Sequence, residues 1–257
     1  MRSESKAYTA NYYEMNVDAN ALASAQELIP FLIKTLAPKS LLELGSGVGI
    51  WSKVALDCGI ADLRAVDGPW VSADRLRVPA DKFLSHHLGT PLNLGRSFDL
   101  ALCLEVGEHL ESGAADILVE SLTRHAPVIV FGAAMPFQGG TLHVNEQWPN
   151  YWRERFEAKG YCMIDVVRPA FWNNSSVAYY YKQNTFVYCK TETMGDLART
   201  LQAAAAECYR SSSNFVFIHP DKYLELATFE NINVTRMVRR APYLLGRALI
   251  NRIKRLF

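Results

Sequence analysis

Titratable side chains suited to proton transfer lie in two short stretches of the chain. Glu108 and His109 closely follow a buried apolar run, and His143 lies in a polar stretch behind a pair of glycines. Because a histidine side chain titrates near neutral pH, it can accept or donate a proton during catalysis. His143 is the first candidate for a general base, with Glu108 and His109 in reserve. Alternatively, the acid caps the following helix, His109 packs below it, and the His143 stretch is a hydrogen-bonded loop staple.

The residues after His143 are also strongly polar. Asn145 and Glu146 could orient the imidazole or hold substrate hydroxyls. Loops in this position carry substrate chemistry because the sheet before them holds them rigidly. No metal cluster is recognisable, although His109 with Glu105 and Glu108 stays open as a weak magnesium site.

A second pattern, in residues 41–51, suits a nucleoside ligand. An apolar run containing the single acid Glu43 leads into three alternate glycines and then a helical pattern: Gly45, Gly47 and Gly49. The order predicts a strand, a tight turn and a helix, with a turn backbone that can approach a ligand at the helix N-terminus. Asp67 ends the next apolar run, at the place where an acid would hold a ribose diol.

The glycine spacing separates two cofactor classes. A dinucleotide-binding turn needs a small residue where this chain has Ile50. The G-x-G-x-G turn preceded by Glu43 instead resembles the first motif of class I S-adenosylmethionine-dependent methyltransferases, and Asp67 matches that family's ribose-binding acid. The resemblance implies S-adenosylmethionine as cofactor. It assigns cofactor contacts to these residues: Glu43, Gly45, Ser46, Gly47, Gly49, Asp67, Gly68, His87, Leu88 and Glu105.

One position departs from that family's pattern. An acid often follows the third strand in these enzymes and accepts a hydrogen bond from the adenine amino group, whereas this chain has His87 there. Trp70, in the turn after Asp67, would stack on the adenine or pack as a core tryptophan.

The stretch 98–110, F-D-L-A-L-C-L-E-V-G-E-H-L, carries the most specific resemblance. It is similar to the fourth-strand motif of methyltransferases that include the ubiquinone-biosynthesis O-methyltransferases. Ligands bind at the carboxyl ends of parallel strands in such sheets. Glu105, Glu108 and His109 are therefore expected at the rim of the active site.

Hydrophobic periodicity predicts the elements that position these residues. Helices are expected over 20–37, 113–124 and 149–159, and further strands over 82–88, 98–104, 127–132, 161–167 and 185–190. We expect an α/β fold with a Rossmann-like, seven-stranded, mostly parallel sheet and helices on both faces. The resemblance implies an antiparallel last strand. The expected divisions are a lead-in over 1–19, a methyltransferase domain over 20–192 and a helical C-terminal extension over 193–257.

Residues 168–184, between the last two strands, are rich in aromatic and amide side chains. Ring faces stack on sugars and amides bond hydroxyls, although the same composition suits a protein interface. Trp172 and Tyr181 are therefore substrate candidates beside Asn145 and Glu146. The histidine stretch and this insertion together resemble bacterial methyltransferases of polysaccharide or glycoconjugate assembly.

Composition restricts the remaining possibilities. The 257 residues are 49% hydrophobic and 21% charged, as in an ordinary globular protein, and a net charge of +1 disfavours nucleic acid as a partner. Five widely spaced cysteines and the lack of a signal peptide predict a cytoplasmic protein.

Residues 236–257 form a basic amphipathic pattern that would lie on an anionic membrane or dock on the protein. The lead-in would close over the cofactor or remain a disordered terminus.

These patterns predict S-adenosylmethionine-dependent O-methylation of a sugar, a glycan or another small hydroxylated acceptor by direct methyl displacement. Two alternatives stay open. One is an N- or C-methyltransferase of a small metabolite, and the other is an inactive methyltransferase-like binding or scaffold protein.

Overall fold

The computed structural model describes residues 17–193, 195, 219 and 222. The chain divides into two units, Met1–Phe217 and Ile218–Phe257, and the second contributes only His219 and Lys222 to the described residues. The predicted lead-in and the basic tail thus lie almost entirely outside what is described, and so does most of the predicted C-terminal extension.

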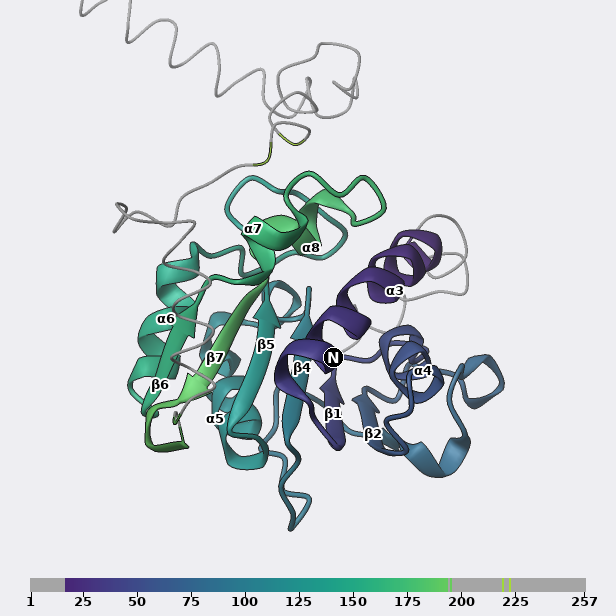
Figure 1. Cartoon of the computed structure of the whole chain (residues 1–257). Coiled ribbons are helices and arrows are strands. Elements are labelled where there is room, and N and C mark those ends of the chain that lie inside the picture. Colours follow the sequence, from purple (N-terminus) through teal and green to yellow (C-terminus); the bar gives the residue numbers. More distant parts are fainter. Residues whose placement is uncertain (1–16, 194, 196–218, 220–221, 223–257) are drawn as a thin grey trace, which may run out of the picture. The chain divides into compact units, whose positions relative to one another are not determined.

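A seven-stranded sheet in the order β3-β2-β1-β4-β5-β7-β6 forms the centre of the first unit (Figure 1). Its strands are β1 (Ser40–Leu44), β2 (Asp62–Asp67), β3 (Phe83–Ser85), β4 (Leu100–Leu104), β5 (Val128–Gly132), β6 (Tyr161–Ile164) and β7 (Phe186–Lys190). The first five strands pair in parallel, and β7 runs antiparallel to both β5 and β6. The predicted fold class is therefore confirmed.

Helices cover both faces of this sheet (Figure 1). They are α3 (Val17–Leu36), α4 (Ile50–Asp57), α5 (Ala115–His125), α6 (Pro149–Glu157), α7 (Val167–Phe171) and α8 (Tyr179–Asn184). Successive strand residues point to opposite faces, so Leu41 packs with α3 and α4 whereas Leu42 packs with α5 and α6. No helix among these residues is long and apolar enough to cross a membrane.

Two predicted strands end three residues earlier than expected, and both lie at edges of the sheet. The strand expected over 82–88 ends at Ser85, because a turn in which Thr90 N–H donates to His87 follows it. The strand expected over 161–167 ends at Ile164, because the ion pair of Asp165 and Arg168 belongs to the start of α7. Both edges therefore place polar residues in loops where the sequence pattern predicted strand.

Candidate active site

A cavity of about 410 Å³ lies at the carboxyl ends of β1, β2 and β4. The glycine turn and α8 contribute to its lining, as do the loops after β2, β3, β4 and β5. Its polar and aromatic lining includes Ser46, Asp67, Trp70, His87, Glu105, Glu108, His109, Glu111, Gln138, His143, Tyr179, Tyr180 and Tyr181. The strand ends thus bring most of the candidate residues into one cavity.

The glycine turn needs its glycines for backbone conformation and for packing. Gly45, Gly47 and Gly49 have φ values of 81°, 53° and 87°, in the region that side chains disfavour. A Cβ on Gly45 would lie 2.1 Å from a methyl carbon of Val106. Gly45 therefore lets the turn pack against the loop after β4 as well as reverse the chain.

Asp67 joins the end of β2 to this turn. One carboxylate oxygen accepts the Gly47 N–H at 2.6 Å and the other accepts the Gly68 N–H at 2.6 Å. Burial raises the pKa of Asp67, while hydrogen bonds from these two amides and from Trp70 partly offset the rise. The acid lines the cavity where the sequence predicted a ribose contact.

Glu43 lies outside the cavity lining, unlike most of the other predicted cofactor residues. It is buried in β1 and accepts hydrogen bonds from the backbone N–H of Ser52, at 2.9 Å, and from the Ser52 hydroxyl. Burial raises its pKa to about 8. Glu43 holds the first turn of α4, so its effect on a ligand passes through the glycine turn. Gly49 and Gly68 also lie outside the lining.

Trp70, His87 and Leu88 line the cavity beside Asp67. The Trp70 and His87 rings stand edge to face with centroids 5.7 Å apart. Trp70 is half-buried and belongs to none of the hydrophobic clusters of buried residues. Of its two predicted roles, the cavity position favours contact with a ligand.

Glu105 lies at the end of β4 in a left-handed conformation, with a φ of 54°. Its carboxylate accepts hydrogen bonds from the side-chain amides of Asn184 and Gln138, each at 2.8 Å. The Asn184 amide also donates to the Gln138 carbonyl at 2.9 Å. Neither amide was a site candidate from the sequence, since nothing in their spacing links α8 to the loop after β5.

Glu108 occupies the short 3₁₀ turn Gly107–His109 and is fully buried. The Ala134 backbone N–H and the Glu105 carboxyl group lie near its carboxyl group, but neither of its oxygens forms a well-aligned hydrogen bond with the described residues. Burial and the nearby Glu105 charge together raise its pKa well above the usual range. The alternative role as a helix cap is wrong, because α5 begins only at Ala115 and has no side-chain cap.

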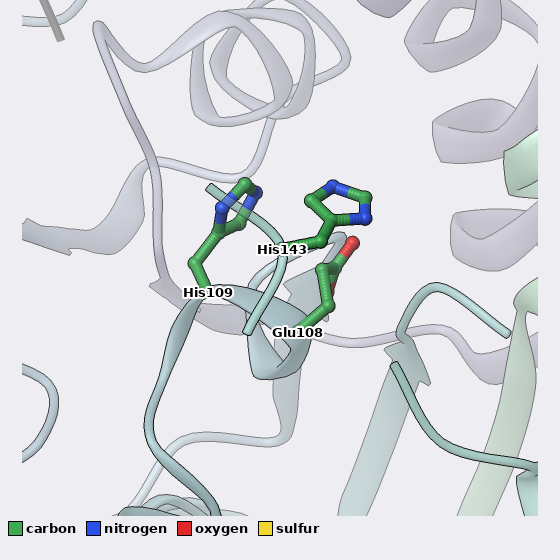
Figure 2. Close-up of side chains that lie close together, drawn as sticks. All are labelled: Glu108, His109 and His143. Carbon is green, nitrogen blue, oxygen red and sulfur yellow. The ribbon is translucent and has the colours of Figure 1, made fainter. Parts of the chain in front are cut away.

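His143 and His109 meet in the cavity, next to Glu108 (Figure 2). Their rings stand edge to face with centroids 4.8 Å apart. His143 Nδ1 lies 3.0 Å from Oε1 of Glu146, so the carboxylate favours the tautomer with a proton on Nδ1 and a lone pair on Nε2. Burial lowers the pKa of His109 to about 4, with a further contribution from His143.

Asn145 and Glu146 lie outside the cavity lining and fix the loop after β5. Glu146 accepts the backbone N–H groups of Phe137 and Gly139 at 2.8 and 2.6 Å. Asn145 is buried, and its N–H donates to the Glu108 carbonyl at 3.0 Å. These hydrogen bonds therefore hold the loop closed, as the alternative interpretation predicted, and they also support His143.

The two aromatic substrate candidates differ in position. Trp172 lies outside the cavity lining, whereas Tyr181 lines it but is buried against Trp51, with ring centroids 4.9 Å apart. The half-buried Tyr179 and Tyr180 also line the cavity, although neither was singled out from the sequence. The insertion thus reaches the cavity through α8 rather than through Trp172.

The fold is the Rossmann-like α/β fold found in solved methyltransferases. An O-methyltransferase family protein from Burkholderia thailandensis is 11% identical, with a TM-score of 0.51 over 73% of this chain and 62% of that chain. Streptomyces venezuelae DesVI is 13% identical, with a TM-score of 0.51 over 72% of this chain and 98% of that chain. The methyltransferase domain of bacterial CtHen1-C is 15% identical, with a TM-score of 0.49 over 66% and 98%. No family model matches the chain, and no curated protein matches it in sequence.

Proposed function

We propose that the protein is an S-adenosylmethionine-dependent methyltransferase acting on an oxygen of a sugar or another small hydroxylated acceptor. The observation that carries the proposal is Asp67, which lies at the end of β2 with both carboxylate oxygens bonded to the backbone beside the cavity. An acid in that position suits a ribose diol. The fold shared with the Burkholderia O-methyltransferase family protein supports the same activity.

The cavity offers a distinct place to each part of the cofactor. The ribose would contact Asp67, and the adenine would lie among Trp70, His87 and Leu88. The methionine portion would pass the glycine turn, whose backbone allows close approach. That arrangement would direct the methyl group toward the cluster of Glu108, His109 and His143.

Methyl transfer needs an aligned acceptor and an exit for one proton. The acceptor oxygen attacks the methyl carbon, the carbon–sulfur bond breaks with its electrons left on sulfur, and S-adenosylhomocysteine departs. His143 Nε2 would take the acceptor proton, while Glu146 holds the ring through Nδ1. Because the leaving group is already positive, alignment and proton removal supply most of the catalysis.

Calorimetric titration with S-adenosylmethionine and S-adenosylhomocysteine tests the cofactor assignment. We expect micromolar binding that weakens about 10-fold or more in Asp67→Ala, since a hydrogen bond to a charged group contributes about 1.5–3 kcal/mol. Asp62→Ala is the matched control, because Asp62 begins the same strand, is exposed and pairs with Arg96. Absence of binding to the intact protein would overturn the proposal.

The acceptor is tested separately by following S-adenosylhomocysteine release with panels of polyols, glycan precursors and amines. Turnover confined to the hydroxylated compounds supports oxygen as the methylated atom. Turnover with amines alone would replace O-methylation with N-methylation on the same scaffold.

A further inference from the structure

We propose that Glu108, His109 and His143 bind a divalent transition-metal ion at the acceptor end of the cavity. One ligand atom from each lies within 4.8 Å of the others, and all three residues line the cavity. Figure 2 shows the two imidazole rings and the carboxylate gathered in one place. In a tetrahedral site with bonds of about 2.1 Å, neighbouring ligand atoms lie about 3.4 Å apart, so side-chain rotations that bring these three atoms closer together would complete the site.

The first independent observation is the state of the Glu108 carboxyl group. It is fully buried; the Ala134 backbone N–H and the Glu105 carboxyl group lie near it, but neither oxygen has a well-aligned hydrogen bond within the described part of the chain. A buried polar group without such bonds is costly, and a cation beside it would remove that cost. Glu105 differs, because its two oxygens already accept amide hydrogen bonds from Asn184 and Gln138. We therefore assign Glu108 and not Glu105 as the carboxylate ligand.

The second observation is that each histidine has a partner that fixes its ring. Glu146 lies 3.0 Å from His143 Nδ1, and His109 donates a hydrogen bond to the backbone carbonyl of Leu142. Metal-binding histidines commonly donate their second N–H to a carboxylate or a carbonyl, which orients the other nitrogen toward the ion. Both rings in the cluster have this arrangement.

The ligand types restrict the choice of ion. Two imidazoles and one carboxylate suit Mn²⁺, Fe²⁺, Co²⁺ or Zn²⁺ rather than the all-oxygen environments that Mg²⁺ and Ca²⁺ prefer. Three protein ligands leave further coordination positions open to the cavity. A hydroxyl group bound there would lose its proton more readily. This catalytic role rests on the proposed function, whereas ion binding itself does not.

With an ion bound, His143 would use its Nε2 lone pair as a ligand. The acceptor proton would then pass to solvent water rather than to the imidazole. The structure thus offers His143 two uses, as a ligand when the ion is present and as a base when it is not, and metal removal distinguishes them.

Titration of Co²⁺ into the chelator-treated full-length protein tests the site through the visible absorption of the bound ion. We expect one saturable site per chain, at least 10-fold weaker in Glu108→Gln and in His109→Gln. His86→Gln is the matched histidine control, because His86 lies outside the cavity lining and should leave Co²⁺ affinity unchanged. Circular dichroism verifies that each variant is folded.

Lack of saturable Co²⁺ binding would overturn the proposal, and so would equal affinity in the wild type and both cluster variants. S-adenosylmethionine affinity is measured on the same samples without added metal. If the cofactor binds and Co²⁺ does not, the metal site fails while the proposed function stands. If Co²⁺ binds and the cofactor does not, the metal site stands while the proposed function fails.

Discussion

Oε1 of Glu146 lies 3.0 Å from Nδ1 of His143, and the same carboxylate group accepts the backbone N–H groups of Phe137 and Gly139. One side chain therefore both closes the loop after β5 and orients the imidazole that faces the cavity. The loop-staple role and the catalytic role are compatible, because the staple fixes the ring in the position that proton transfer needs.

Replacing Glu146 with glutamine should separate these two roles. The amide oxygen can keep the contacts of Oε1 with Gly139 and His143, whereas the NH2 group replaces the oxygen that accepts from Phe137. The side chain also no longer carries a charge beside His143. We expect turnover to fall about 10-fold in Glu146→Gln and about 100-fold in His143→Ala, with unchanged cofactor affinity in both. Steady-state rates and calorimetry measure the two quantities. The control Glu154→Gln, at an exposed position of α6, should behave as wild type, and wild-type turnover in Glu146→Gln would refute the orienting role.

Gly140 leaves the space that the His143 ring occupies. A Cβ added to Gly140 would lie 2.2 Å from Nε2 of His143, so Gly140→Ala should displace the imidazole. We expect a fall in turnover of about 10-fold or more with little change in cofactor affinity. Gly113→Ala is the matched control, because nothing lies within 4 Å of its added Cβ. Equal rates in the two variants would mean that the ring position does not limit the reaction.

The central strands were predictable because they are buried on both faces. β4 and β5 read as continuous apolar runs, β1 reads as an apolar run with one acid, and the glycine turn marks where β1 ends. The edge strands were less predictable, since β3 and β6 stop where local polar contacts of His87 and Asp165 take over. Periodicity reports burial, and burial alone does not fix where an edge strand ends.

Site residues could be predicted from the sequence where they belong to one short motif. They could not be predicted where the site brings together segments that are far apart in the chain. Asp67 was identified from its distance along the chain to the glycine turn. Gln138 and Asn184 were not, because their hydrogen bonds to Glu105 join residues 33 and 79 positions apart. Asn145 was expected to hold substrate, but its side-chain oxygen accepts from Gln147 and its backbone N–H donates to the Glu108 carbonyl after β4.

The basic tail, residues 236–257, lies outside the described residues, and its membrane contact stays a prediction from the sequence. Seven basic residues and no acid occur between residues 231 and 257. We expect the intact protein to sediment with phosphatidylserine-containing vesicles, to be released by high salt and to ignore neutral vesicles. Deletion of residues 241–257 should abolish sedimentation. If the truncated protein sediments as much as the intact protein, the tail does not bind the membrane, and its basic residues form a solvated face instead.

Glu43 should make stability depend on pH in an unusual direction. Burial raises its pKa to about 8, whereas the unfolded chain releases the same proton near pH 4.5. Between these values the folded state binds the extra proton, so stability falls as pH rises, by at most about 1.4 kcal/mol per pH unit. In Glu43→Gln the amide oxygen can still accept from Ser52 without a buried charge. Urea unfolding at pH 5 and pH 8 should therefore show the variant gaining stability relative to wild type as pH rises.

The exposed Glu157→Gln variant at the end of α6 provides the baseline for that comparison. Its stability should follow the wild-type curve at both pH values, because the substitution leaves the buried Glu43 carboxyl group and its Ser52 partner unchanged. If Glu43→Gln also runs parallel to wild type, the Glu43 carboxyl group must titrate alike in both states. The hydrogen bonds from the Ser52 N–H and hydroxyl would then stabilise the ionised carboxylate enough to cancel the cost of its burial. Glu43 would in that case be charged in the folded protein while it supports the glycine turn.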